Sequence, residues 1–147
     1  MSRVLIIDDC EQVRRIVHAV LSGSIAELIE AGSGAEGLQA WAQHRPDLVI
    51  VDYEMPELNG AQVTKAIREQ ERGGWTRTAI LMMTSHGDAR HVAAAREAGV
   101  DGFIAKPLTA LLILERAFTL LATSGAFSID AMLNESAPPT APTLSPP

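Results

Sequence analysis

Short runs of apolar residues alternate along this chain with longer stretches in which apolar positions recur every three or four residues. Residues 3–7 are continuously apolar after Arg3, which is typical of a parallel strand buried on both faces. Comparable runs predict further strands at residues 25–30, 48–51, 78–83 and 102–105. The run 25–30 mixes apolar and acidic side chains, so we expect this strand to lie nearer an edge of the sheet.

The stretches between these runs have the spacing of amphipathic helices. Apolar residues at three- and four-residue spacing predict an amphipathic helix that ends near Gly23, and they are Val13, Ile16, Val17, Val20 and Leu21. The same spacing predicts helices at residues 33–43, 88–98 and 109–122. It also predicts a helix that runs through residues 63–67 and ends at the glycines at 73–74. Five strands that alternate with five helices predict one α/β domain, with a doubly wound parallel sheet covered on both faces.

Composition narrows the class of protein. The chain has 147 residues and a formal net charge of −6, and it contains no cluster of Lys and Arg, which argues against direct binding to nucleic acid. The single cysteine, Cys10, excludes an internal disulfide and fits a reducing compartment. The first apolar run is too short for a signal peptide or a membrane span, so we expect a soluble, cytoplasmic protein with no membrane insertion.

The predicted domain covers residues 1–124, and residues 125–147 form a C-terminal extension that is rich in proline and is expected to be disordered from about residue 136. The last predicted helix carries more apolar residues than one buried stripe needs. Its excess apolar surface either contacts a partner or is covered by residues 125–133, and the sequence leaves both readings open.

Polar residues follow four of the five predicted strands. They are Asp8 and Asp9 after the first strand, Asp52 after the third, Thr84 and Ser85 after the fourth, and Lys106 after the fifth. Because the carboxyl ends of parallel strands share one edge of the sheet, we expect these side chains to converge. Three crowded carboxylates repel one another, which would drive at least one toward protonation unless a divalent cation is bound. Oxygen ligands without a Cys/His constellation favour Mg²⁺ over zinc.

This set of residues suits phosphoryl transfer. A carboxylate held near Mg²⁺, such as Asp52, can attack phosphorus and form an aspartyl phosphate. Lys106 would supply positive charge, and the hydroxyl of Thr84 would bond a phosphoryl oxygen. Positioning and charge neutralisation are what this chemistry needs, and it requires no histidine in the site.

Four segments in chain order carry a resemblance to a known family: residues 4–9 (VLIIDD), 49–60 (VIVDYEMP with Asn59-Gly60), 83–85 (MTS) and 103–107 (FIAKP). Over about residues 3–122 the chain closely resembles the receiver domain of bacterial two-component response regulators, in particular the single-domain chemotaxis regulators. The resemblance implies a flavodoxin-like (βα)5 fold with the strand order 2-1-3-4-5.

The resemblance also assigns roles to residues. Asp52 is the implied phosphoacceptor, and Mg²⁺ would be held by Asp9, by Asp52 and by the backbone carbonyl of Glu54, while Asp8 would act through the metal's water. Thr84 and Phe103 are the implied switch pair. The bond between Lys106 and the proline after it is expected to be cis.

A stand-alone receiver would accept its phosphoryl group from a histidine kinase or a histidine phosphotransfer protein. It would signal to a downstream protein through the face made by helix 4, strand 5 and helix 5, and homodimer formation stays open. Such a domain is a signalling protein rather than an enzyme. Phe103 stands where many chemotaxis-type receivers have tyrosine, and Glu54 is hypothesised to tune the lifetime of the phosphoryl group.

Other interpretations stay open at this point. The chain could be the receiver part of a longer regulator with an output domain, a Mg²⁺-dependent phosphatase that uses Asp52 as nucleophile, or a binding module that is never phosphorylated. The phosphatase is disfavoured because haloacid-dehalogenase-like enzymes need an aspartate where this chain has Glu54. Turnover of a small phosphomonoester would separate the two.

Some residues have a plainer explanation. Asp8 or Asp9 could also cap the helix that follows. The glycines at 32, 34 and 37 match a dinucleotide-binding motif, but Ser33 and Glu36 predict a capping box that explains this segment locally. Neighbouring carboxylates disfavour a reactive thiolate at Cys10. The histidines at 86 and 91 are interpreted as surface residues.

Overall fold

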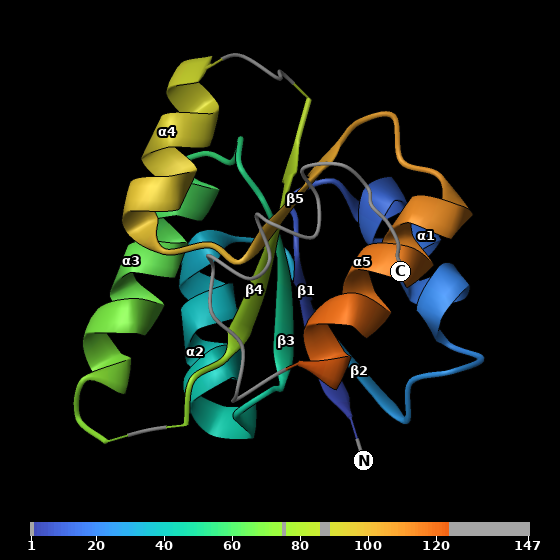
Figure 1. Cartoon of the computed structure of the whole chain (residues 1–147), viewed down its shortest axis with the longest axis horizontal. Helices are drawn as coiled ribbons and strands as arrows, with labels where there is room; N and C mark the ends of the chain where they lie inside the picture. Colours follow the sequence, from blue (N-terminus) through green and yellow to red (C-terminus); the bar gives the residue numbers. More distant parts are fainter. Residues whose placement is uncertain (1, 75, 86–88, 124–147) are drawn as a thin grey trace.

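The computed structural model describes residues 2–74, 76–85 and 89–123 (Figure 1). The boundary predicted at residue 124 and the extension at 125–147, including its proposed cover for the last helix, lie outside the described residues.

Five parallel strands form one sheet in the order β2-β1-β3-β4-β5, which confirms the predicted fold. The strands are β1 (Arg3–Ile7), β2 (Glu27–Ala31), β3 (Leu48–Asp52), β4 (Ala79–Thr84) and β5 (Gly102–Ala105). Strands β2 and β5 are the two edges, so the expectation of an edge position for the second strand is confirmed.

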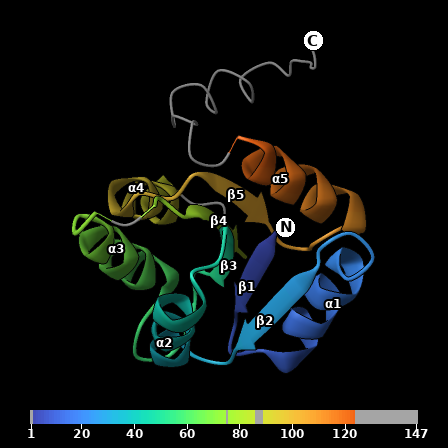
Figure 2. The ribbon, with the colours of Figure 1, turned by 90° about the horizontal axis from the view of Figure 1, so that it is seen from below.

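Helices cover both faces of this sheet. They are α1 (Glu11–Leu21), α2 (Gly34–His44), α3 (Gly60–Glu71), α4 (Ala89–Ala98) and α5 (Ala110–Ala122). Helices α1 and α5 lie on one side, and α2, α3 and α4 lie on the other (Figure 2). The predicted start of α4 at residue 88 falls on a residue outside the described part.

The apolar strand runs are explained by two cores, one on each face. Val4 and Ile6 belong to the core under α1 and α5, whereas Leu5 and Ile7 belong to the core under α2, α3 and α4. All four side chains are fully buried. A strand that is buried on both faces has no polar side, and this is why β1 and β3 show no alternation in the sequence.

Two local predictions were wrong. The second strand begins at Glu27 rather than at residue 25, because the N–H of the buried Ile25 bonds the carbonyl of Leu21 and so belongs to the turn that closes α1. The capping box at α2 is only half formed: Ser33 accepts the N–H of Glu36, but Glu36 Oε1 accepts the N–H of Gly32.

A complete capping box occurs instead at α3, where Asn59 and Gln62 each accept the other's backbone N–H. Among the residues that the structure describes, none of the helices combines the length and the apolar character needed to cross a bilayer.

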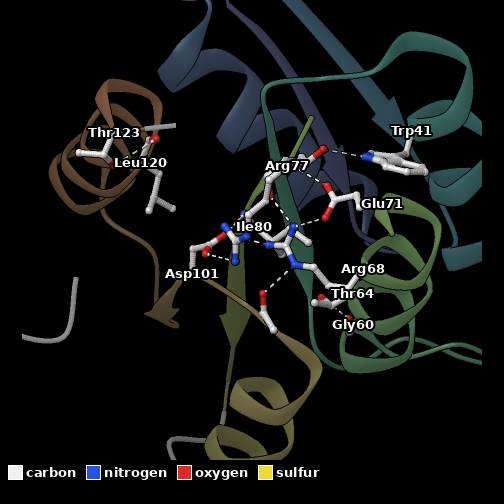
Figure 3. Close-up of polar contacts among 12 residues, drawn as sticks. Trp41, Gly60, Thr64, Arg68, Glu71, Arg77, Ile80, Asp101, Leu120 and Thr123 are labelled. Carbon is white, nitrogen blue, oxygen red and sulfur yellow. Dashed lines mark hydrogen bonds and ion pairs between the residues drawn. The ribbon is translucent and has the colours of Figure 1, made fainter. Parts of the chain in front are cut away.

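A buried ion-pair network lies at the amino edge of the sheet (Figure 3). Asp101, immediately before β5, pairs with Arg68 of α3 at 2.9 Å and with Arg77 at 2.7 Å. Arg68 also donates to Glu71 Oε1 at 2.7 Å and to the carbonyls of Gly99 and Thr78. The network therefore joins α3 to the segments that enter β4 and β5.

Candidate functional site

The predicted site residues follow strands at the carboxyl edge, opposite the ion-pair network. Ile7 of β1 pairs with Val51 of β3, so Asp8 and Asp52 come next on neighbouring strands. Thr84 of β4 pairs with Ala105 of β5, and Lys106 follows directly. The parallel register therefore carries all these residues to one edge, as the sequence predicted.

Three carboxylates meet at this edge. Oxygen atoms of Asp8, Asp9 and Asp52 all lie within 4.8 Å of one another. Asp8 is fully buried and Asp52 is 4% exposed, whereas Asp9 is exposed to solvent. The site is thus a mostly buried acidic cluster with one side chain open to water.

Lys106 completes the cluster from β5. Its Nζ lies 3.0 Å from Asp52 Oδ1 and 3.8 Å from Asp8 Oδ2. Its backbone N–H donates to the carbonyl of Thr84 at 2.8 Å, which ties the residue to the end of β4. The bond between Lys106 and Pro107 is cis, as the family resemblance implied.

Burial raises the pKa of Asp52 to about 6, with a further contribution from the charge of Asp8, and the hydrogen bond and charge of Lys106 oppose this shift. Burial also raises the pKa of Asp8. The prediction that one carboxylate is driven toward protonation is therefore confirmed in direction. Its main cause is loss of solvent, with repulsion between carboxylates second.

The pKa of Lys106 responds to opposing influences. Burial lowers it, but the hydrogen bond from Lys106 to Asp52 and the charges of Asp52 and Asp8 outweigh burial and raise it. The ammonium is therefore held in its charged form beside the carboxylate of Asp52.

The donor set fits a hard divalent cation. Asp8 Oδ1 accepts the N–H of Cys10 at 2.9 Å, whereas Asp8 Oδ2 is buried and has no hydrogen-bond partner. A buried carboxylate oxygen without a hydrogen bond is costly unless a cation or water satisfies it. Because the three clustered side chains offer only oxygen, they match the ligand preference of Mg²⁺.

The segment after Asp52 is held in a tight turn. A Cβ atom at Gly60 would lie 2.5 Å from the backbone oxygen of Asp52, so the turn requires glycine there. Glu54 has an exposed side chain, and its Oε1 accepts a hydrogen bond from Ser85 Oγ at 2.8 Å. The contact joins the segment after Asp52 to the segment after Thr84.

The implied switch residues occupy neighbouring strands. Thr84 is 5% exposed at the end of β4. Phe103 of β5 is partly buried and packs against the core under α2, α3 and α4, and its carbonyl accepts a hydrogen bond from Arg116 of α5. The ring therefore belongs to the side of the sheet that α4 covers.

Sequence reasoning missed Arg14. Its Nη1 donates to the backbone oxygen of Asp8 at 2.6 Å, and its Nε donates to Glu30 of β2 at 3.1 Å. In the sequence this arginine looks like any residue of the polar face of α1, so no signal marked it. It fixes the backbone from which the carboxylate of Asp8 extends.

Two minor interpretations were wrong. Neither aspartate caps α1: the N-cap is Cys10, which makes no side-chain capping bond. His91 is only partly exposed, and its ring stacks on Tyr53, so it is more than a surface residue. Residue 86 lies outside the described part of the chain.

Comparisons with known proteins agree with this geometry. The family described as "Response regulator receiver domain" matches residues 4–118. The chain is 34% identical to the chemotaxis protein CheY of Halobacterium salinarum over 105 residues, which cover 71% of this chain and 84% of that protein. It is 33% identical to the transcriptional regulatory protein KdpE of Mycobacterium tuberculosis over 107 residues, which cover 73% of this chain and 45% of KdpE.

Among solved structures, the chemotaxis protein CheY4 of Vibrio cholerae superposes with a TM-score of 0.75 at 28% identity, over 82% of this chain and 98% of that chain. A match of sequence and fold over most of the chain, with the acidic cluster at the expected edge, leads to one assignment. The chain belongs to the family of response regulator receiver domains.

Proposed function

We propose that Asp52 accepts a phosphoryl group from a histidine kinase or a histidine phosphotransfer protein in the cytoplasm. The observation that carries this proposal is the position of the Asp52 carboxylate, which is buried beside two other carboxylates and lies 3.0 Å from Lys106 Nζ. Family membership supports the same role, because phosphorylation on aspartate is typical of receiver domains.

In the proposed reaction an oxygen of Asp52 attacks phosphorus, the phosphorus–nitrogen bond of the donor histidine breaks, and its electron pair stays on the imidazole. Lys106 remains protonated and pairs with the charge on the phosphoryl oxygens. The hydroxyl of Thr84, at the end of the neighbouring strand, donates to one of these oxygens. Burial of Asp52 keeps bulk water away from the reacting carboxylate.

Asp9, Asp52 and the backbone carbonyl of Glu54 would hold Mg²⁺, and Asp8 would contact it through water. When bound, Mg²⁺ supplies the positive charge that lets a phosphoryl group approach three carboxylates. The oxygen of Asp8 that lacks a hydrogen bond supports this arrangement.

The proposed output is a change of the α4–β5–α5 face. As Thr84 moves toward the phosphoryl group, the ring of Phe103 would enter the space that it leaves, and a downstream protein would read the altered face. The match along 84% of a chemotaxis protein CheY supports signalling by protein contact. Membership of the receiver family does not favour the phosphatase alternative.

The proposal is tested by intact-mass spectrometry after incubation with acetyl phosphate and Mg²⁺. The wild-type chain is expected to gain the mass of one phosphoryl group, and Asp52→Asn is expected to gain none. Chelation of Mg²⁺ should suppress the gain. A phosphoryl group on the Asp52→Asn variant would show that another residue is the acceptor.

Glu54 provides a smaller test of the same site. We expect Glu54→Ala to slow the loss of the phosphoryl group, since it removes a carboxylate that can accept a proton from the attacking water. The decay of the added mass after removal of acetyl phosphate measures this rate. An unchanged rate would exclude Glu54 from control of the phosphoryl lifetime.

A further inference from the structure

Two contacts join the residues after Asp52 to the residues after Thr84. Ser85 Oγ donates to Glu54 Oε1 at 2.8 Å. The rings of Tyr53 and His91 stack with their centroids 4.2 Å apart and their planes inclined by 25°. We call these four residues, Tyr53, Glu54, Ser85 and His91, the clasp.

One side of the clasp is rigid. The N–H of Tyr53 donates to the carbonyl of Met83 at 2.8 Å, and the carbonyl of Tyr53 accepts the N–H of Gly60 at 2.9 Å. Tyr53 is thus bonded to β4 and to the start of α3. A change at Tyr53 would have to disturb the sheet edge, so this side serves as the fixed anchor.

The other side consists of Ser85 and His91, which are expected to move with Thr84 and with α4. Ser85 directly follows Thr84, and His91 lies in the first turn of α4. Among the residues of α4 whose exposure is described, only Ala95 is fully buried, and the rest of its apolar surface comes from Val92 and small alanines. A ring stack buries more area than an alanine contact, so it contributes much of the attachment at this end of α4.

We propose that the clasp stabilises the resting positions of α4 and of Ser85, and that phosphorylation must release it. The inference rests on the proposed function, in which the hydroxyl of Thr84 moves toward the phosphoryl group on Asp52. A shift of Thr84 carries Ser85 with it and separates Ser85 from Glu54. The phosphoryl group also brings negative charge close to the carboxylate that Ser85 holds.

Ser85 and His91 are then positioning residues that act through α4 rather than on phosphorus. A contact that exists in only one of two conformations shifts the equilibrium between them by the free energy of that contact. If the released conformation is the one in which Asp52 is phosphorylated, loss of the contact raises the phosphorylation rate of Asp52 by the same factor as the population. Removing one stacked or hydrogen-bonded contact of this kind should change the populations about fivefold.

The clasp can be tested because Tyr53 is the only tyrosine of the chain. Fluorotyrosine incorporation therefore gives a single ¹⁹F NMR signal from the clasp. Adding Mg²⁺ and beryllofluoride, which mimics a phosphoryl group on a carboxylate, should move this signal in the wild-type chain. Ser85→Ala removes the hydrogen bond to Glu54 without changing either ring, so it weakens the clasp and should move the signal of the untreated chain toward the beryllofluoride position.

Phosphorylation rates test the stack itself. His91→Ala should gain phosphoryl mass from acetyl phosphate about fivefold faster than wild type. His91→Phe keeps a stacking ring and should react at the wild-type rate, which separates stacking from the polar contacts of the histidine. Glu97→Gln, an exposed change in the last turn of α4, is the matched control and should also react like wild type.

Each failure has its own meaning. If wild type gains mass but His91→Ala reacts no faster than His91→Phe, the clasp is overturned and the phosphoacceptor function stands. A Tyr53 signal that Ser85→Ala leaves in place overturns the clasp as well, and this arm does not depend on the folding of His91→Ala. If wild type gains no phosphoryl group with Mg²⁺ present, both proposals fail together.

Discussion

Two groups of mostly buried charges lie at opposite edges of the same sheet, and they differ in how well they are paired. At the amino edge, Asp101 and Glu71 face Arg68 and Arg77, and Asp101 Oδ2 also accepts the N–H of Ile80 at 2.8 Å (Figure 3). At the carboxyl edge, the carboxylates of Asp8, Asp9 and Asp52 lie together, and Lys106 pairs with two of them, Asp52 and Asp8. One group is balanced, and the other carries an excess of negative charge.

The difference distinguishes a structural cluster from a functional one. Buried charges that are fully paired hold segments together, and they need no ligand. Neither Asp101 Oδ1 nor Asp8 Oδ2 makes a hydrogen bond, but Arg77 Nη2 lies 2.7 Å from Asp101 Oδ1, whereas Lys106 Nζ lies 3.8 Å from Asp8 Oδ2. Asp8 and Asp52 also have raised pKa values, so a bound cation would complete the carboxyl edge. Incomplete pairing, more than burial alone, therefore marks the candidate site.

The largest expected effect on stability is at the balanced cluster. Asp101→Ala would remove one of the two carboxylates that pair with Arg68 and the carboxylate that pairs with Arg77. It would also leave the N–H of Ile80 without its acceptor. We expect a loss of about 3–5 kcal/mol in the free energy of unfolding, measured by urea denaturation. Glu69→Gln, an exposed change on the same helix as Arg68, is the control. A loss no larger than that of the control would contradict the structural role.

At the carboxyl edge, removal of a carboxylate should raise the free energy of unfolding rather than lower it. The folded-state pKa of Asp52 is about 6, above the value of about 3.9 of an unfolded aspartate. Its proton therefore stabilises the fold below about pH 4, and this contribution is lost as pH rises through about 6. In metal-free buffer at pH 7, Asp52→Asn should be more stable than wild type by about 2 kcal/mol.

Urea denaturation at several pH values checks this prediction. The wild-type chain should lose stability between about pH 4 and pH 6 relative to Asp52→Asn, since Asp8 is present in both proteins and only the wild type also carries the carboxylate of Asp52. Parallel pH profiles for the two proteins would mean that the carboxylate of Asp52 is not destabilised by its surroundings.

A smaller effect is expected when a cation balances the carboxyl edge. Mg²⁺ at about ten times its dissociation constant should add about 1.4 kcal/mol to the stability of wild type, measured by thermal or urea unfolding with and without EDTA. Asp9→Asn should lose most of this gain, and its exposed side chain makes a folding defect small. Equal stabilisation of the Asp9→Asn variant would place the cation elsewhere.

The sequence predicted the layers of the fold well because its signals are local. In β3 (Leu48–Asp52) every residue before the final aspartate is apolar, and such a run indicates a strand that is buried on both faces. The spacing of Val13 and Val17 indicates a helix without any information from other elements. The start of β2 was misplaced because Ile25 is apolar for a different reason, namely its burial in the turn after α1.

The amino-edge network gave no sequence signal, since Arg68 and Asp101 are 33 positions apart and each resembles an ordinary surface charge. The same holds for Arg14, whose contact with the backbone of Asp8 depends on how α1 lies across β1. Pairings of this kind depend on packing between elements, which hydrophobic periodicity does not encode.

By itself the sequence determined that acidic, hydroxyl and ammonium groups follow neighbouring parallel strands, and hence that they meet at one edge. Only the tertiary structure decided that Lys106 contacts Asp52 more closely than Asp8, that burial dominates the pKa of Asp52, and that Tyr53 stacks on His91. The reason is physical: strands and helices follow from local patterns, and the family resemblance implied the strand order, whereas register, distances, desolvation and ring contacts depend on how every neighbouring element packs.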